Sequence, residues 1–294
     1  MSFLQAIVMA ILQGVTELFP VSSLGHAAIL PALLAWPADP RGPGFLPFLV
    51  ILHLGTATAL LLFYWREWVG LALALVGLGD PATRPALRRQ IGLLAIGTVP
   101  AALAGFFFNH FFKELFGAPS LAAIFLIVNG LILFVGDRRH RLRSAEAGGD
   151  KGKSIEALTV SDAVIIGVAQ CAALVPGISR SGVTIVAGLG RKLSSDASAH
   201  FSFLLAAPII GGAALLEIPK LLRRIHEGHP VTPDLQTSIV AGIVAGIAAY
   251  ISIAFLTRYF KATEVKMMRP FALYCALVGI AAMAWFALHA QGQG

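Results

Sequence analysis

Two short polar motifs interrupt apolar stretches of the chain, and they carry the residues best suited to chemistry. The first reads TELFPVSSLGH, from Thr16 to His26, and the second reads LVPGISRSGVT, from Leu174 to Thr184. Each contains a proline followed three residues later by a serine. Glutamate, histidine and arginine are costly in hydrocarbon and occur there mainly where they serve a function. The two motifs together therefore predict a functional site.

The first motif offers a carboxylate, an imidazole and two hydroxyls. Gln13 and Glu17 lie four residues apart and share a face of a helix. If a helix restarts after the proline, Ser23 and His26 also share a face near its N-terminus, and Ser22 or Ser23 caps it. Glu17 and His26 are then the candidates for an acid/base or metal-binding pair.

The second motif offers an anion-binding helix end. Ser179 or Ser181 is expected to cap the helix that carries Thr184. Two helix N-termini would then point into one buried space, and their unpaired N–H groups favour an anion. Arg180 adds a planar fork of donors that suits phosphate oxygens. These groups predict a phosphoryl-transfer site, and the chain has neither a Walker glycine loop nor an HExxH motif, so nucleotide hydrolysis is not indicated.

Composition places these motifs in a membrane. Hydrophobic residues make up 57% of the chain and charged residues 13%, with a mean hydropathy of +0.81, whereas a soluble domain is about 25% charged. The basic balance is explained by Lys and Arg in cytoplasmic loops rather than by nucleic-acid binding. The only cysteines, Cys171 and Cys275, lie in apolar segments, so we expect no disulfide and no metal–thiolate site.

The hydropathy pattern predicts an all-α integral membrane protein. A span needs roughly 20 residues to cross a hydrocarbon core of about 30 Å. Six segments qualify: 46–65, 89–112, 118–136, 199–221, 236–257 and 270–289. Two further apolar regions, 2–36 and 160–190, are broken by the motifs and predict re-entrant helical hairpins, since irregular backbone at membrane depth must be buried in protein or line a polar cavity.

The order of these segments predicts an inverted repeat. Residues 1–136 and 160–294 each form one hairpin and three spans, joined by a cytoplasmic linker at 137–159. Because three is an odd number, the second repeat is inverted, as in many transporters. With both termini outside, the cytoplasmic loops and the bordering Arg89 hold 16 of the 22 Lys and Arg residues, which agrees with the positive-inside rule.

Both motifs also resemble the signatures of the undecaprenyl-diphosphate phosphatases, which are also called bacitracin-resistance proteins. The family pattern [E/Q]xxxExxPxSSxGH resembles the stretch from Gln13 to His26, which reads QGVTELFPVSSLGH. The pattern PGxSRSxxT resembles the stretch from Pro176 to Thr184, which reads PGISRSGVT. Both match throughout, in the expected order and separation, and length and hydropathy fit along the whole chain.

The resemblance implies an enzyme of the bacterial plasma membrane that hydrolyses undecaprenyl diphosphate to undecaprenyl phosphate and inorganic phosphate. That reaction recycles the lipid carrier of peptidoglycan synthesis and confers bacitracin resistance. The resemblance also implies two interlocked inverted repeats and a site open to the outer face of the membrane. It implies a divalent cation, Mg²⁺ or Ca²⁺, as the cofactor.

Site residues follow from the same resemblance. Glu17, His26 and Arg180 are the main catalytic candidates, with Ser23 beside them. The phosphate-binding candidates are Arg180, Ser179, Ser181, Thr184 and Ser22. The first acidic position of the signature is Gln13 here, and an amide is a poor metal ligand, so we expect the cation to rest mainly on Glu17 and the substrate's own phosphates.

Several alternatives stay open at this point. The nucleophile is Ser23, His26 or a water, with Glu17 and His26 favoured as the working pair. A transporter or flippase for an anionic lipid is the second hypothesis, because an inverted repeat alone favours it. The acid/base groups beside the anion site favour the enzyme. The oligomeric state is also open, a homodimer included, and we expect His53 to pack or to support the site indirectly.

Overall fold

The computed structural model describes residues 1–37, 42, 44–108, 111, 114–115, 117–227, 233–262 and 267–290, and only the backbone of Arg224 and Ala290. The described part is helical, with one isolated β-bridge between Lys153 and Leu193. The first half contains α1 (Phe3–Thr16), α2 (Ser23–Leu33), α3 (Phe45–Phe63), α4 (Trp65–Leu75), α5 (Arg84–Phe107) and α7 (Pro119–Ala147). The second half contains η1 (Ile155–Ala157), α8 (Val160–Gln170), η2 (Cys171–Leu174), α9 (Arg180–Gly190), α10 (Ser195–His226), α11 (Leu235–Ala262) and α12 (Arg269–Ala290).

Six of these helices are long and apolar enough to cross a membrane, which confirms the predicted number of spans. They are α3, α5, α7, α10, α11 and α12. Large apolar side chains such as Phe107, Leu215 and Ile251 are exposed on their outer faces, as expected where lipid is the neighbour. The end of the predicted span 89–112 includes positions outside the described residues, and α5 ends at Phe107.

The predicted linker 137–159 is not a loop along its whole length. Helix α7 continues to Ala147 and ends where Gly148 adopts a left-handed φ of 69°, a common helix stop. The basic residues after position 137 suggested a loop, but arginine is a good helix former. Asp137 is buried and accepts from the backbone N–H of Met268 at 3.0 Å, so α7 is held to the start of α12 beyond its apolar part.

Each motif forms the turn between two short helices. Helix α1 begins with a capping box between Ser2 and Gln5, and α8 begins with one between Thr159 and Asp162. Ser22 caps α2 and Ser179 caps α9, so the expected capping of both helices by motif serines is confirmed. Helices of 14 and 11 residues are too short to span, which fits two re-entrant hairpins.

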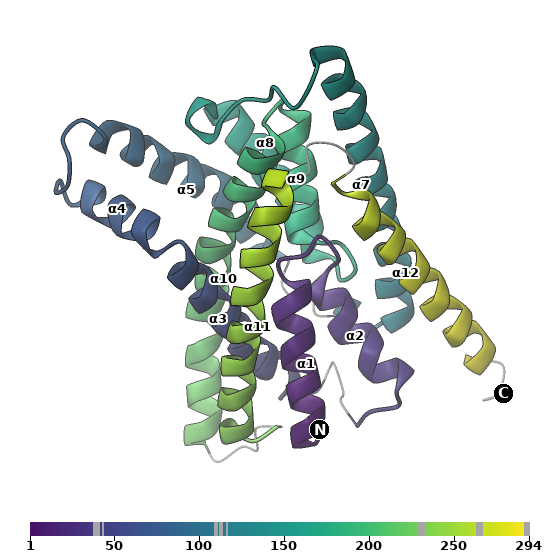
Figure 1. Ribbon diagram of the computed structural model, residues 1–294. Coiled ribbons are helices and arrows are strands. Elements are labelled where there is room, and N and C mark those ends of the chain that lie inside the picture. The colour runs from purple at the N-terminus through teal and green to yellow at the C-terminus, as the bar shows by residue number, and fades with distance from the viewer. Residues whose placement is uncertain are drawn as a thin grey trace.

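The two halves of the chain pack into each other rather than side by side. Helix α1 packs against α11, α8 against α5, α7 against α12, and α3 against both α10 and α11 (Figure 1). Glycines allow the closest crossings: a Cβ at Gly55 would lie 2.0 Å from the Gly242 carbonyl oxygen, and a Cβ at Gly167 would lie 2.5 Å from that of Gly97. This arrangement fits two interlocked halves, although the boundaries 1–136, 137–159 and 160–294 stay predictions.

The ends of the helices fall on two sides of the molecule. The N-terminus, the C-terminal ends of α10 and α12 and the start of α11 lie at the lower end of Figure 1, whereas the C-terminal ends of α7 and α9 lie at the upper end. The N-terminus and the end of α12 are therefore on the same side, which fits the prediction of both termini on one side.

Candidate active site

A cavity of about 290 Å³ lies where the two motif turns meet α3, α5 and α10. Most of its wall is apolar. Its polar lining consists of Thr16, Glu17, Ser22, Ser23, His53, Gln170, Ser179, Arg180 and Glu217. The N-termini of α2 and α9 both reach this cavity, so the predicted meeting of two helix N-termini in one buried space is present.

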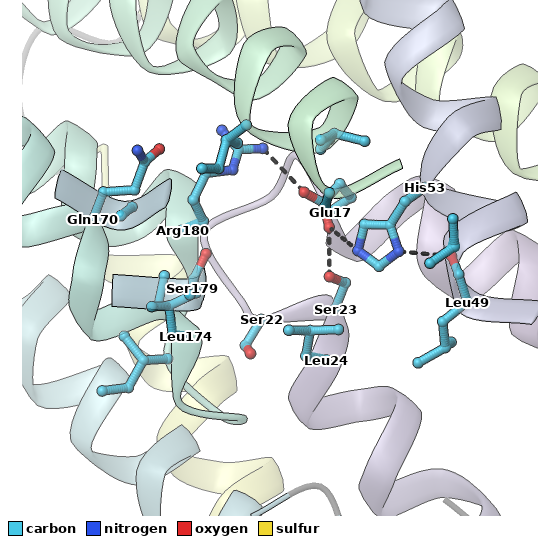
Figure 2. Close-up of a pocket in the computed structure, with 18 of the residues that line it drawn as sticks. Glu17, Ser22, Ser23, Leu24, Leu49, His53, Gln170, Leu174, Ser179 and Arg180 are labelled. Carbon is cyan, nitrogen blue, oxygen red and sulfur yellow. Dashed lines mark hydrogen bonds and ion pairs between the residues drawn. The ribbon is translucent and has the colours of Figure 1, made fainter. Parts of the chain in front are cut away.

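Glu17 is the centre of the polar cluster (Figure 2). Its Oε1 accepts a hydrogen bond from Arg180 Nη2 at 3.1 Å, which joins the two motifs in an ion pair. Its Oε2 accepts from Ser23 Oγ at 2.6 Å and from Gln13 Nε2 at 3.2 Å, and His53 Nε2 lies 3.4 Å from the same oxygen. One carboxylate therefore contacts the Arg180 guanidinium, the His53 imidazole and a hydroxyl that can give it a proton.

The first turn is held in a demanding conformation. Ser22 has a φ of 67°, a region that side chains other than glycine seldom adopt. Its Oγ accepts from the backbone N–H groups of Gly25 and Gly177, both at 3.2 Å. Its carbonyl oxygen lies 2.7 Å from Nδ1 of His26. These contacts turn the Ser22 hydroxyl away from Glu17 and direct Ser23 toward it (Figure 2).

The second turn depends on a glycine and two serines. Gly177 has a φ of 104°, and a Cβ there would lie 2.3 Å from the Ala122 carbonyl oxygen. Ser179 Oγ accepts from the N–H of Gly182 at 3.1 Å as the cap of α9. Ser181 Oγ donates to the Phe19 carbonyl at 3.1 Å, so it ties the second turn to the first.

Arg180 is anchored from the side opposite Glu17. Its Nη1 donates to the Ser202 carbonyl of α10 at 3.0 Å. The Thr184 hydroxyl lies 2.7 Å from Ser202 Oγ and donates to the Arg180 carbonyl at 2.8 Å. The guanidinium is thus fixed with one edge toward the cavity, while Thr184 supports it from behind.

The structure brings some of the predicted site residues together and leaves others apart. Glu17, Ser23 and Arg180 meet in the cavity, and Ser22 and Ser179 line it. Three other residues contact the cluster without lining the cavity: Gln13, Ser181 and Thr184.

His26 does not form the predicted pair with Glu17. Its Nδ1 lies against the Ser22 carbonyl, and its Nε2 lies 2.9 Å from the Tyr274 hydroxyl, with the two rings stacked 5.6 Å apart. It is also not among the described residues that line the cavity. The His26 ring therefore holds the first turn through the Ser22 carbonyl instead of contacting Glu17.

His53 of α3 takes the place beside Glu17 that sequence reasoning gave to His26. Its Nδ1 lies 2.7 Å from the Leu49 carbonyl and its Nε2 faces the Glu17 carboxylate, so both nitrogens point at acceptors. We expected His53 to pack or to support the site indirectly, and its contact with Glu17 is consistent with the supporting role. An ionisable residue within an apolar span was the signal that could have found it.

Gln170 is a polar residue of the site that the sequence analysis did not single out. It is buried in the wall of the cavity that Arg180 also lines (Figure 2), and its Nε2 donates to the Gly97 carbonyl at 3.3 Å. Its Oε1 has no hydrogen-bond partner among the described residues. An amide oxygen in that state is available to a bound water or substrate group.

The donor set suits a cation that shares its ligands with the substrate. Among the described residues, no group of three or more His, Cys, Asp or Glu side chains is placed to hold a metal ion. Gln13 turns its Nε2 toward the Glu17 carboxylate, and its buried Oε1 has no partner among the described residues. Mg²⁺ commonly uses one or two protein oxygens together with substrate phosphates, and Glu17 lines the cavity as one such oxygen ligand, with Gln13 a weaker candidate.

Comparison with known proteins agrees with this geometry. The bacitracin resistance protein BacA family matches residues 6–281. The chain belongs to this family. It is 48% identical over 279 residues to an undecaprenyl-diphosphatase of Acidiphilium cryptum, covering 95% of this chain and 96% of the relative.

Two other relatives of the BacA family are similar over comparable lengths. An undecaprenyl-diphosphatase of Granulibacter bethesdensis is 48% identical over 291 residues, covering 97% of each chain. Undecaprenyl-diphosphatase 2 of Chromobacterium violaceum is 43% identical over 280 residues, covering 95% of this chain and 97% of the relative. The BacA relationship therefore extends over almost the whole chain.

Proposed function

We propose that this protein hydrolyses undecaprenyl diphosphate to undecaprenyl phosphate and inorganic phosphate. The observation that carries the proposal is the contact of Glu17 with Ser23 on one oxygen and Arg180 on the other, inside a largely apolar cavity. The names of the relatives support the substrate. The reaction returns the lipid carrier to peptidoglycan synthesis and supports bacitracin resistance.

In the proposed mechanism, Arg180 and the N-termini of α2 and α9 hold the diphosphate. Ser23 attacks the terminal phosphorus while Glu17 accepts the hydroxyl proton over the 2.6 Å contact. The bond from phosphorus to the bridging oxygen breaks and undecaprenyl phosphate leaves. A water then attacks the phosphoserine, releases inorganic phosphate and restores the Ser23 hydroxyl.

Direct attack by water is the alternative to a phosphoserine. In that mechanism Glu17 takes the proton from a water beside Ser23, and Ser23 orients that water. His53 stabilises the Glu17 carboxylate in both mechanisms, since it lies 3.4 Å from Oε2. The position of His26 behind the turn makes it a less suitable nucleophile than Ser23.

A divalent cation completes the proposal. Glu17 would hold it together with substrate phosphates, with Gln13 as a weak further ligand, and when bound it would neutralise the charge that develops on the phosphate oxygens. Arg180 supplies part of the same charge compensation, because it keeps its guanidinium at the cavity edge.

The substrate's tail is proposed to leave the site sideways into lipid. The apolar part of the cavity wall comes mainly from α3, α5, η2 and α10, including Leu49, Gly105 and Ile209. We place the site toward the outer face of the plasma membrane. The distribution of Lys and Arg among the loops supports that orientation.

Phosphate release in detergent tests the proposal. Purified protein is given undecaprenyl diphosphate with Mg²⁺, Ca²⁺ or EDTA, and the Glu17→Gln and Arg180→Lys variants are compared with Glu146→Gln, whose side chain is exposed on the far end of α7. We expect cation-dependent release that both site variants lose and the control keeps. No release from folded wild-type protein would contradict the enzyme and favour a transporter that binds its anion at Arg180.

A further inference from the structure

Asn129 lies in the middle of α7, outside both motifs, and its side chain is completely buried. Helix α7 packs against α2 and α9, the two helices whose N-termini reach the cavity. A buried carboxamide in an apolar span needs partners for its donors and acceptor. The partners that Asn129 finds are the two motif turns.

The carboxamide bridges these turns directly. Its Nδ2 donates to the Pro20 carbonyl at 3.0 Å and contacts Cys275 Sγ at 3.3 Å. Its Oδ1 accepts from the backbone N–H of Ser179 at 3.0 Å. One planar group therefore binds the first turn through its donor and the second turn through its acceptor.

Both bonded backbone groups are close to the reacting side chains. Pro20 lies midway between Glu17 and Ser23 in the sequence, three residues from each, and Ser179 immediately precedes Arg180. As the N-cap of α9, Ser179 has no partner within the helix for its N–H, so Asn129 supplies one. The position of Asn129 thus sets how far the Glu17 turn lies from the start of α9.

The other hydrogen bonds between the two turns do not fix them relative to the rest of the protein. The contacts of Ser22 with Gly177 and of Ser181 with Phe19 join one turn to the other, so the two could shift together. Asn129 instead belongs to a long helix that is packed along α12. It fixes both turns against the body of the protein.

We propose that Asn129 is a positioning residue for the hydrolysis, holding the Glu17–Ser23 turn and the Arg180 helix at their catalytic spacing. This inference rests on the proposed function. Removal of the Asn129 carboxamide should misplace the reacting groups without removing any of them. A misplacement of about 1 Å can cost about 100-fold in rate.

The first test replaces the amide by an apolar group of similar size. We expect Asn129→Leu to lower kcat for undecaprenyl diphosphate about 100-fold, with a much smaller change in KM. Binding of inorganic pyrophosphate, measured by calorimetry, should weaken about tenfold, because Arg180 and the helix ends no longer converge on one anion.

The conservative variant gives a signature that loss of packing does not. A protonated carboxyl group in Asn129→Asp keeps one acceptor and one O–H donor in the same plane, and burial favours that neutral form. The ratio of its kcat to that of wild type should therefore be highest near pH 5.5 and fall as the pH rises. Asn129→Leu should show no such recovery at low pH.

Leu256→Ala serves as the control for stability, since Leu256 is fully buried on α11 and belongs to the apolar core. It should lower Tm but keep kcat and pyrophosphate affinity. The inference is overturned if Asn129→Leu keeps kcat and pyrophosphate affinity within twofold of wild type. It is also overturned if Leu256→Ala, at a similar loss of Tm, lowers both as much as Asn129→Leu does. If wild-type protein releases no phosphate, the proposed function fails, while weaker pyrophosphate binding by Asn129→Leu still supports Asn129 as the group that spaces the two turns.

Discussion

The two adjacent serines of the first motif have different partners. Ser23 Oγ donates to Glu17, whereas Ser22 Oγ accepts from two backbone N–H groups and holds the turn. The sequence cannot separate their roles, because either hydroxyl could cap α2. The left-handed conformation of Ser22 decides it, since it makes Ser22 the cap and leaves Ser23 free to face the carboxylate.

We therefore expect Ser23→Ala and Ser22→Ala to fail in different ways. Ser23→Ala should lower kcat by at least about 1000-fold with Tm unchanged, as expected on loss of a nucleophile. Ser22→Ala should lower stability by about 1 kcal/mol through the lost cap. Phosphate release and thermal unfolding of both variants check this. Retention of most activity by Ser23→Ala would favour water as the nucleophile.

The roles of His53 and His26 should also be distinguishable by mutation. We expect His53→Gln to lower kcat about 100-fold, because it removes the imidazole that contacts the Glu17 carboxylate. Tyr274→Phe removes only the hydroxyl that contacts His26 Nε2, so its effect should stay below tenfold. Steady-state kinetics of both variants test the assignment, and the opposite ranking would return the catalytic role to His26.

At the scale of elements, a polar cluster joins α4, α5 and α10 away from the cavity. Glu67 accepts from Gln90 Nε2 at 2.6 Å and lies 2.8 Å from His200 Nε2. Partial burial raises the pKa of the Glu67 carboxyl, but its bonds to His200 and Gln90 outweigh this and hold the pKa below its usual range. The cluster fastens the short helix α4 to two spans.

That pKa shift predicts a pH-dependent contribution to stability. A depressed carboxyl pKa stabilises the fold above the unfolded-state value of about 4.3 and loses that contribution as the pH falls through the folded-state value. Glu67→Gln should therefore unfold about 2 °C below wild type at pH 7. The difference should begin to shrink below about pH 4.3 and vanish once the pH lies below the lowered folded-state pKa. Thermal unfolding across this range is the measurement, and a difference that persists in acid would contradict the argument.

The helix crossings predict opposite outcomes for two glycines. A Cβ at Gly55 would lie 2.0 Å from the Gly242 carbonyl oxygen, so Gly55→Ala should separate α3 from α11 and cost about 1–3 kcal/mol. Gly211 in α10 has nothing within 4 Å of such a Cβ, so Gly211→Ala should be neutral or stabilise by up to about 1 kcal/mol. Urea or thermal unfolding in detergent distinguishes the two, and equal effects would refute the close crossing.

Over the whole molecule, the sequence predicts the helices well and the contacts between distant segments of the chain poorly. The six spans and the capped motif turns follow from hydropathy and local signals. His53, Gln170 and Asn129 do not, because each is a lone polar residue in an apolar helix and only the packing of distant segments gives it a partner. The extension of α7 was missed because its basic residues suggested a solvated loop.

The ion pair between Glu17 and Arg180 also has a consequence for biosynthesis. The two residues are 163 positions apart, so at roughly 5–20 residues per second the ribosome adds the arginine about 8–33 s after the glutamate. During that interval the carboxylate has no guanidinium partner, and an uncompensated charge in hydrocarbon is costly. The nascent first hairpin is therefore expected to remain near the lipid headgroups and to reach its final depth only when the second hairpin inserts.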